Sequence, residues 1–103
     1  RSLAMSSRNA YLSPEERRIA ARLPAILREL VAAAERGDEL SALCARGIAE
    51  LKAAGFASVD YLEFRDAETL APVSRIERPA RILVAARLGN TRLIDNMPVG
   101  VPA

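Results

Sequence analysis

The sequence predicts an α+β fold, with two to three helices packed on a small three-stranded antiparallel sheet, in one domain covering residues 1–103. Three observations support this fold class. Apolar residues recur at helical spacing over the first half of the chain. After Gly55 the pattern changes to short β-rich segments, and Gly89-Asn90 joins two of them as a hairpin turn. Helices followed by strands indicate a sheet covered by helices on one face.

The first helical stretch opens with a strong N-terminal signal. Ser13 is placed to be the N-cap, Pro14 occupies the first helical position, and Glu16 follows three residues after the cap, which is the pattern of a capping box. Pro24 interrupts the apolar run that follows, because proline lacks a backbone donor and clashes with the preceding turn. We therefore expect a kink or two abutting helices near Arg22-Leu23.

A second helix follows a glycine. Gly37 is placed to be a left-handed C-cap of the first stretch. The next helix is expected to start at Asp38 or Ser41 and to run to about Ala53, and Gly55 ends it.

Three β-rich segments make up the second half of the chain. Residues 58–65 are predicted to form a strand, and residues 66–78 a polar connection. Residues 80–88 are almost continuously apolar, as expected for a central strand. Residues 91–97 return antiparallel, and the prolines and glycine from Pro98 onward are predicted to form a frayed end.

The composition excludes several classes of protein. With 50% hydrophobic and 27% charged residues the chain suits a folded, soluble domain. A net charge of +2 is too small to indicate nucleic-acid binding, and no apolar run approaches the roughly 18 residues of a membrane span. The single cysteine, Cys44, fits a reducing compartment, and we interpret it as a small core residue rather than a nucleophile. We expect a cytoplasmic protein with no nucleic-acid and no membrane partner.

Two further features bear on chemistry. The chain has no histidine, so it cannot build a histidine base or a histidine metal site by itself, and no metal ligands are predicted. The chain begins at Arg1, in what reads as a loop, which indicates a piece of a longer protein.

The segment Met5-Ser6-Ser7-Arg8-Asn9 is the main candidate for binding chemistry. Consecutive hydroxyls and backbone N–H groups suit a tetrahedral oxyanion, and an arginine fork spreads positive charge over a polyphosphate. Ser-Ser-Arg also occurs widely by accident, so a solvated approach to the helix is the alternative.

Charged side chains within the predicted strands form a second candidate. They are either a substrate-facing patch or a sheet face whose opposite charges pair across neighbouring strands, and we favour the pairing. The residues concerned are Asp60, Glu63, Arg65, Arg87, Arg92 and Asp95.

Three blocks of sequence, in order, resemble the C-terminal domain of the pantothenate synthetase (pantoate–β-alanine ligase) family. The first covers residues 3–12 (LAMSSRNAYL), the second Gly55-Phe56 with residues 59–63 and 65–70, and the third residues 80–89 leading to 91–96. The resemblance spans essentially the whole chain. It implies a nucleotide-lid domain of a two-domain ligase, whose Rossmann-like, histidine-bearing N-terminal domain lies outside this sequence.

The resemblance also implies an activity. The family condenses pantoate and β-alanine with ATP and Mg²⁺, through a pantoyl adenylate, to give pantothenate, AMP and diphosphate. The full-length enzyme is expected to be a homodimer that uses its own N-terminal domain, and the isolated fragment is expected to be inactive.

Carried over residue by residue, the resemblance assigns the nucleotide contacts to one short segment. Met5 would meet the adenine through its backbone, Ser6 and Ser7 would donate to the triphosphate, and Arg8 would offset charge on the departing pyrophosphate. Ser6, Ser7 and Arg8 are thus the expected catalytic residues, with positioning and electrostatic roles rather than base catalysis. A small α+β interaction module with no nucleotide site is the alternative from another functional class, and the lid of a different adenylate-forming ligase is a third.

Overall fold

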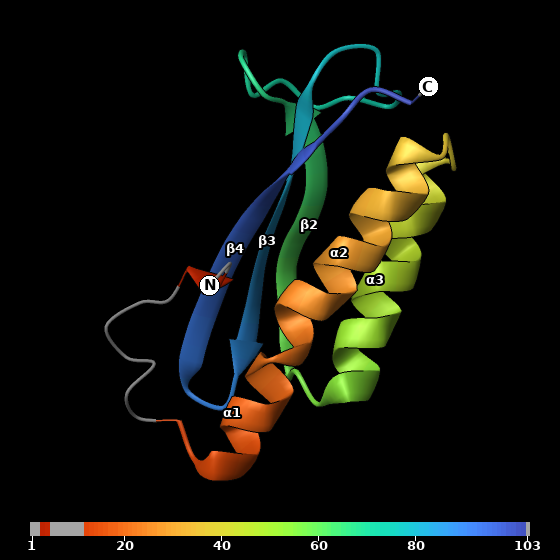
Figure 1. Cartoon of the computed structure of the whole chain (residues 1–103). Coiled ribbons are helices and arrows are strands. Elements are labelled where there is room, and N and C mark those ends of the chain that lie inside the picture. Colours follow the sequence, from red (N-terminus) through yellow and green to blue (C-terminus); the bar gives the residue numbers. More distant parts are fainter. Residues whose placement is uncertain (1–2, 5–11, 103) are drawn as a thin grey trace.

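Helices cover one face of an antiparallel sheet in the computed structural model, which describes residues 3–4 and 12–102 (Figure 1). The sheet has the order β1-β4-β3-β2, and its strands are β1 (Leu3–Ala4), β2 (Ser58–Asp66), β3 (Ala80–Leu88) and β4 (Thr91–Val99). The helices are α1 (Pro14–Ala20), α2 (Arg22–Glu35) and α3 (Leu40–Ala54). The predicted α+β fold is confirmed, and the two-residue strand β1 at the edge of the sheet is an addition to it.

The break between α1 and α2 confirms the effect expected of Pro24. The first helix ends at Ala20 and the second begins at Arg22, so Pro24 is the third residue of α2. In that position the missing N–H falls where helical donors are unpaired in any case. The two helices therefore abut at Ala21, whose own N–H donates to the carbonyl of Arg17 at 3.0 Å.

The end of α2 is a left-handed turn, as Gly37 predicts. Gly37 has a φ of +93°. Its N–H donates to Ala34 O at 3.0 Å, and the N–H of Asp38 donates to Ala33 O at 3.1 Å, which together make a Schellman motif. The helix α3 then runs one residue beyond the predicted end.

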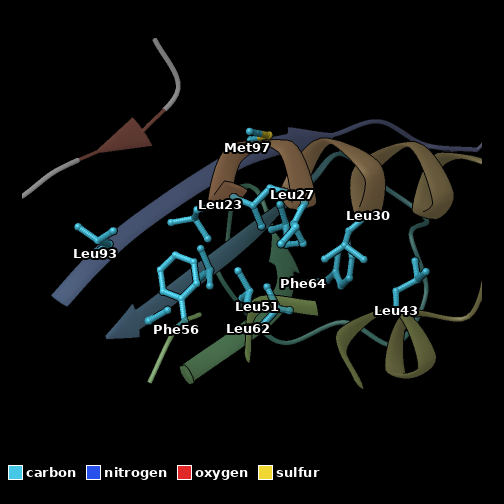
Figure 2. Packing of buried hydrophobic residues seen from close by; sticks show 14 of the residues in the cluster. Leu23, Leu27, Leu30, Leu43, Leu51, Phe56, Leu62, Phe64, Leu93 and Met97 are labelled. Atoms are coloured by element: carbon cyan, nitrogen blue, oxygen red, sulfur yellow. The ribbon is translucent and has the colours of Figure 1, made fainter. Parts of the chain in front are cut away.

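The core lies between the two long helices and the sheet (Figure 2). It is built largely of leucine from α2 and α3, with aromatic and aliphatic side chains from the strands. The labelled members are Leu23, Leu27, Leu30, Leu43, Leu51, Phe56, Leu62, Phe64, Leu93 and Met97. Gly47 lets α3 approach this layer, because a Cβ there would lie 2.6 Å from Leu62 Cδ2 and 2.7 Å from Leu30 Cδ1.

The last strand corrects one expectation. We expected Pro98 to mark a frayed end, but β4 continues through it to Val99, with Pro98 opposite Arg81. The two-residue turn makes Leu88 and Thr91 a hydrogen-bonded pair, and such pairs alternate along the ladder, so Pro98 falls at a non-hydrogen-bonded position. Its ring nitrogen faces away from β3, where no ladder bond is lost.

The outer edge of β4 is only partly covered by β1. Leu3 pairs with Asp95 and Ala4 with Ile94. Beyond that point the N–H of Asn96 donates to Asp95 Oδ1 at 2.8 Å, and the N–H of Gly100 donates to Glu35 Oε2 at 2.7 Å.

Candidate functional site

The predicted nucleotide segment is bounded by two elements whose positions the structure gives. Met5, Ser6, Ser7 and Arg8 lie outside the described residues, so their contacts stay predictions. The site can therefore be built from its two flanks, strand β1 before it and helix α1 after it.

The upstream flank is fixed to the sheet. Strand β1 pairs antiparallel with β4, Leu3 opposite Asp95 and Ala4 opposite Ile94. Because the pairing is antiparallel, the step from Leu3 to Ala4 runs toward the end of β4 that carries the β3–β4 turn. The chain thus leaves β1 in the direction of the hairpin.

The downstream flank is fixed to the core and capped. Leu12 is buried among the core side chains. Ser13 Oγ accepts a hydrogen bond from Glu16 N at 3.1 Å, and Glu16 Oε1 accepts one from Ser13 N at 2.9 Å. With Pro14 at the first helical position, these bonds confirm the predicted capping box.

The second oxygen of Glu16 lies against the β3–β4 turn. Gly89 has a φ of +59°, and a Cβ added there would overlap Glu16 Oε2. The first turn of α1 therefore rests on the same hairpin that holds β1 through β4. Both flanks of residues 5–11 are attached to one element.

Three of the charged strand residues, Asp60, Arg87 and Arg92, pair across neighbouring strands, as we predicted. Asp60 Oδ2 accepts from Arg92 Nε at 2.8 Å, and Asp60 Oδ1 lies 3.4 Å from Arg87 Nε. The guanidinium carbon of Arg92 also lies 6.0 Å from the centroid of the Tyr61 ring. The hydrogen bond from Arg92 and, more weakly, the contact with Arg87 hold the pKa of Asp60 below its usual value against the opposing effect of desolvation.

A second pair lies further along β2. Arg65 Nη2 lies 2.7 Å from Glu63 Oε2, and Arg65 Nη1 donates to Leu70 O at 2.8 Å. Leu70 is exposed and has a φ of +62°, unusual for a residue with a Cβ. Asp95 is buried within β4, and its Oδ1 accepts from Asn96 N at 2.8 Å.

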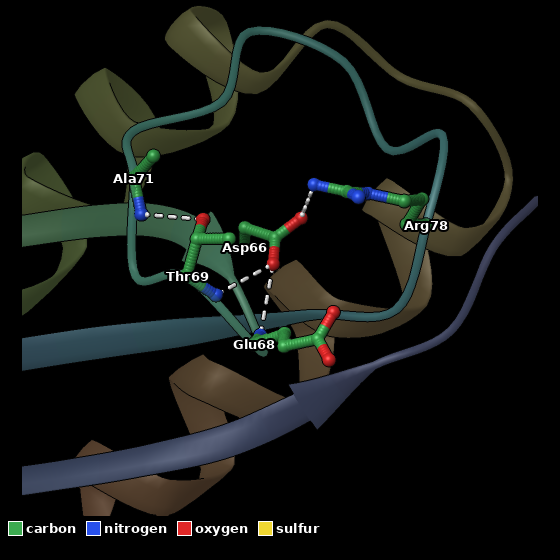
Figure 3. Close-up of polar contacts among 5 residues, drawn as sticks. All are labelled: Asp66, Glu68, Thr69, Ala71 and Arg78. Atoms are coloured by element: carbon green, nitrogen blue, oxygen red, sulfur yellow. Dashed lines mark hydrogen bonds and ion pairs between the residues drawn. The ribbon is translucent and has the colours of Figure 1, made fainter.

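The carboxylate of Asp66 organises the connection between β2 and β3, a role that sequence reasoning missed (Figure 3). Its Oδ1 accepts from Glu68 N at 2.8 Å and from Thr69 N at 2.9 Å, and its Oδ2 pairs with Arg78 Nη2 at 2.6 Å. The N–H of Thr69, then that of Glu68, and the Arg78 guanidinium keep the pKa of Asp66 low, opposed by desolvation. An Asp followed by Thr three residues later is the signal that indicates such an Asx-type turn.

Cys44 behaves as the small core residue that we predicted. It is half-buried on α3 and packs against the core. Burial, and secondarily the charge of Glu63, raise the pKa of its thiol above the ordinary value. A thiol with a raised pKa is a poor nucleophile at neutral pH.

The part of the chain that the structure describes covers residues 3–4 and 12–102. Within these ranges no group of three or more His, Cys, Asp or Glu side chains is arranged to hold a metal ion. None of the helices in the same part of the chain combines the length and the apolar character needed to cross a membrane.

Comparison with known proteins gives one consistent family. The sequence profile described as Pantoate-beta-alanine ligase matches residues 1–98. The chain is 55% identical over 97 residues to a pantothenate synthetase of Rhizorhabdus wittichii and 57% identical over 99 residues to one of Novosphingobium aromaticivorans. These matches cover 94% and 95% of this chain but 34% and 35% of the relatives, so the chain spans about a third of the length of these curated relatives.

The structural comparison identifies the same family as the sequence comparison. A crystal structure of pantothenate synthetase from Thermus thermophilus superposes with a TM-score of 0.79 at 40% identity, over 93% of this chain and 35% of that one.

Proposed function

The chain belongs to the pantoate–β-alanine ligase family, and from this premise we propose that it is the C-terminal, nucleotide-contacting domain of a complete ligase of that family. The match of residues 1–98 to the family profile is the observation that carries the proposal. The substrates are then pantoate, β-alanine and ATP, and the products are pantothenate, AMP and diphosphate.

The proposed reaction has two steps. The pantoate carboxylate attacks the α-phosphorus of ATP, the bond from that phosphorus to the bridging oxygen breaks, and pyrophosphate leaves. The β-alanine amine then attacks the acyl carbon of the pantoyl adenylate, an amide bond forms, and AMP leaves. Negative charge develops on the leaving pyrophosphate in the first step, which is where cationic donors accelerate such a reaction.

The proposed contacts come from the segment between β1 and α1. Ser6 and Ser7 donate to the triphosphate, Arg8 balances charge on the pyrophosphate, and Met5 meets the adenine through its backbone. The flanks support this role, because β1 and the start of α1 both contact the β3–β4 hairpin, and fixed flanking elements reduce the entropy cost of positioning a ligand. In this proposal the segment binds and orients the nucleotide and supplies no base.

The required Mg²⁺ is proposed to enter the site with ATP. Among residues 3–4 and 12–102, no group of three or more His, Cys, Asp or Glu side chains is arranged to hold a metal ion. Magnesium commonly binds through substrate phosphates with few protein ligands, which is consistent with an ion carried by the nucleotide. The rest of the ligase, including its own N-terminal domain and a homodimeric partner, is part of the proposal, as is a cytoplasmic location.

The test is the substitution Arg8→Ala in the complete ligase. Loss of charge stabilisation should slow adenylation, measured by ATP–pyrophosphate exchange, by about 2–4 kcal/mol in activation free energy. Arg18→Ala, on the exposed side of α1, is the matched control and should leave exchange unchanged. If adenylation were unchanged and only the β-alanine step slowed, the role given to Arg8 would be wrong.

A second measurement separates the ligase domain from an interaction module without a nucleotide site. An NMR titration of residues 1–103 with Mg-ATP should shift signals of residues 5–9, whereas a module predicts a silent segment. Full pantothenate synthesis by these 103 residues alone would contradict the two-domain proposal.

A further inference from the structure

We propose that Glu16 and Gly89 form a positioning contact for the nucleotide segment, by which the start of α1 is set against the hairpin that also holds β1. The inference rests on the proposed function, since the segment matters only if it binds ATP. Neither residue touches the nucleotide in this proposal. Their contact sets the start of α1 against the hairpin whose strand β4 pairs with β1, the two described elements that flank residues 5–11.

The hairpin is a suitable frame for such a contact. Strands β3 and β4 pair without irregularity from Ala80 opposite Val99 to Leu88 opposite Thr91. Leu88 and Thr91, which flank the turn, are both buried. The position of Gly89 is therefore fixed by a regular ladder with buried ends.

The contact itself leaves no room for a side chain at Gly89. A Cβ there would overlap Glu16 Oε2, the far end of a flexible side chain that would ordinarily move aside. This carboxylate is already engaged, because Glu16 Oε1 accepts from Ser13 N at 2.9 Å. We expect the added methyl group either to displace the carboxylate, which weakens the capping box, or to displace the turn, and in both cases to disturb the contact between α1 and the hairpin.

The chain offers a matched control for the backbone effect. Gly37 also has a positive φ, +93°, but a Cβ there meets nothing within 4 Å. Alanine at either glycine therefore strains the backbone, and only alanine at Gly89 disturbs the contact with Glu16.

The experiment compares Gly89→Ala with Gly37→Ala in the complete ligase. We expect Gly89→Ala to raise the KM for ATP in ATP–pyrophosphate exchange by about 10-fold more than Gly37→Ala does, a coupling within the range seen for contacting residues. The KM for β-alanine should not change. A merely structural role would lower the melting temperature or the active fraction in both variants without a selective effect on the KM for ATP.

A double substitution identifies the contact as the cause. In a Glu16→Ala background no carboxylate remains to overlap, so adding Gly89→Ala should then change the KM for ATP by about 2-fold or less. An equal effect of Gly89→Ala in both backgrounds, or an effect no larger than that of Gly37→Ala, would overturn the proposal.

Two checks distinguish a failure of this inference from a failure to fold and from a failure of the proposed function. If Gly89→Ala does not give folded protein, Glu16→Asp shortens the reach to the turn by one methylene, and Glu15→Asp on the same helical turn is its control. A higher KM for ATP in Glu16→Asp alone supports the contact, and equal values overturn it. If Arg8→Ala is itself without effect on exchange, the proposed function fails; if Arg8→Ala acts and the Gly89 variants do not, only this inference fails.

Discussion

Replacing Gly47 with alanine tests how closely α3 approaches the core. Gly47 lies within α3 on its buried side, and the Cβ of an alanine there would lie 2.6 Å from Leu62 Cδ2 and 2.7 Å from Leu30 Cδ1. Ordinary contacts begin at 3.4 Å, so each methyl group must move by about 0.7 to 0.8 Å. Leu30 is 0% exposed and Leu62 is 5% exposed, which leaves little space for either to move into.

Two effects of opposite sign decide the outcome. Alanine is favoured over glycine within a helix by about 1 kcal/mol. Overpacking a well-filled core costs about 1–3 kcal/mol, and the upper part of that range applies because two buried side chains must move. We therefore expect Gly47→Ala to lower the free energy of unfolding by about 1–2 kcal/mol, or the melting temperature by about 5–15 °C.

The assay is urea unfolding of residues 1–103 followed by circular dichroism. Leu62→Val removes the Cδ atoms that oppose the new methyl group, so the cost of Gly47→Ala should be smaller in that background. A Gly47→Ala protein about 1 kcal/mol more stable than the parent, as helix propensity alone predicts, would refute the reasoning.

Two further predictions follow from the titrating groups. The pKa of Asp66 is lowered in the folded chain, so its contribution to stability is present above the unfolded value of 3.8 and is lost as the pH falls through the lower folded value. The difference in unfolding free energy between the parent and Asp66→Asn should therefore be full at pH 6 and shrink below about pH 4. A difference that persists unchanged at pH 2 would argue against this origin. Burial raises the pKa of Cys44, so iodoacetamide should alkylate it more slowly than a free thiol at pH 7.5 and faster as the pH rises above 9.0; rapid alkylation at pH 7 would contradict the half-buried thiol.

Features that depend on nearby residues could be predicted from the sequence. The capping box at Ser13 and Glu16, the helix break before Pro24 and the turn at Gly89 each follow from backbone requirements of the residue itself or of a neighbour within one helical turn. The α+β fold follows from the change of apolar period after Gly55. These predictions required no knowledge of tertiary contacts.

Features that depend on distant partners could not be predicted. Strand β1 is two residues long and exists only because β4, some ninety positions later in the chain, offers it an edge. The ion pair between Asp66 and Arg78 joins the two ends of the connection between β2 and β3. The local sequence pattern of that connection does not reveal its path. Our prediction for Pro98 was wrong because a proline fits in a strand when its nitrogen faces away from the paired strand. The pairing register set by Leu88 and Thr91 determines which way the nitrogen of Pro98 faces.

For the candidate site, the sequence predicts the binding chemistry of Met5–Arg8. It does not predict the contact between Glu16 and Gly89 beside this segment. Neither Glu16 nor Gly89 stood out as a partner of the other, since they are 73 positions apart and each has a sufficient local explanation. A helix cap and a hairpin turn gain a shared role only when the fold brings them together.

The outer edge of β4 has a consequence for self-association. An exposed strand edge is a template on which another chain can form hydrogen bonds, and β1 covers only a short part of this one. Past β1, each outward donor position is closed in a different way: the N–H of Asn96 is taken by Asp95, Pro98 has none, and the N–H of Gly100 is taken by Glu35. A foreign strand therefore finds no available backbone donor at these three positions, which makes this stretch of the edge a poor nucleus for aggregation.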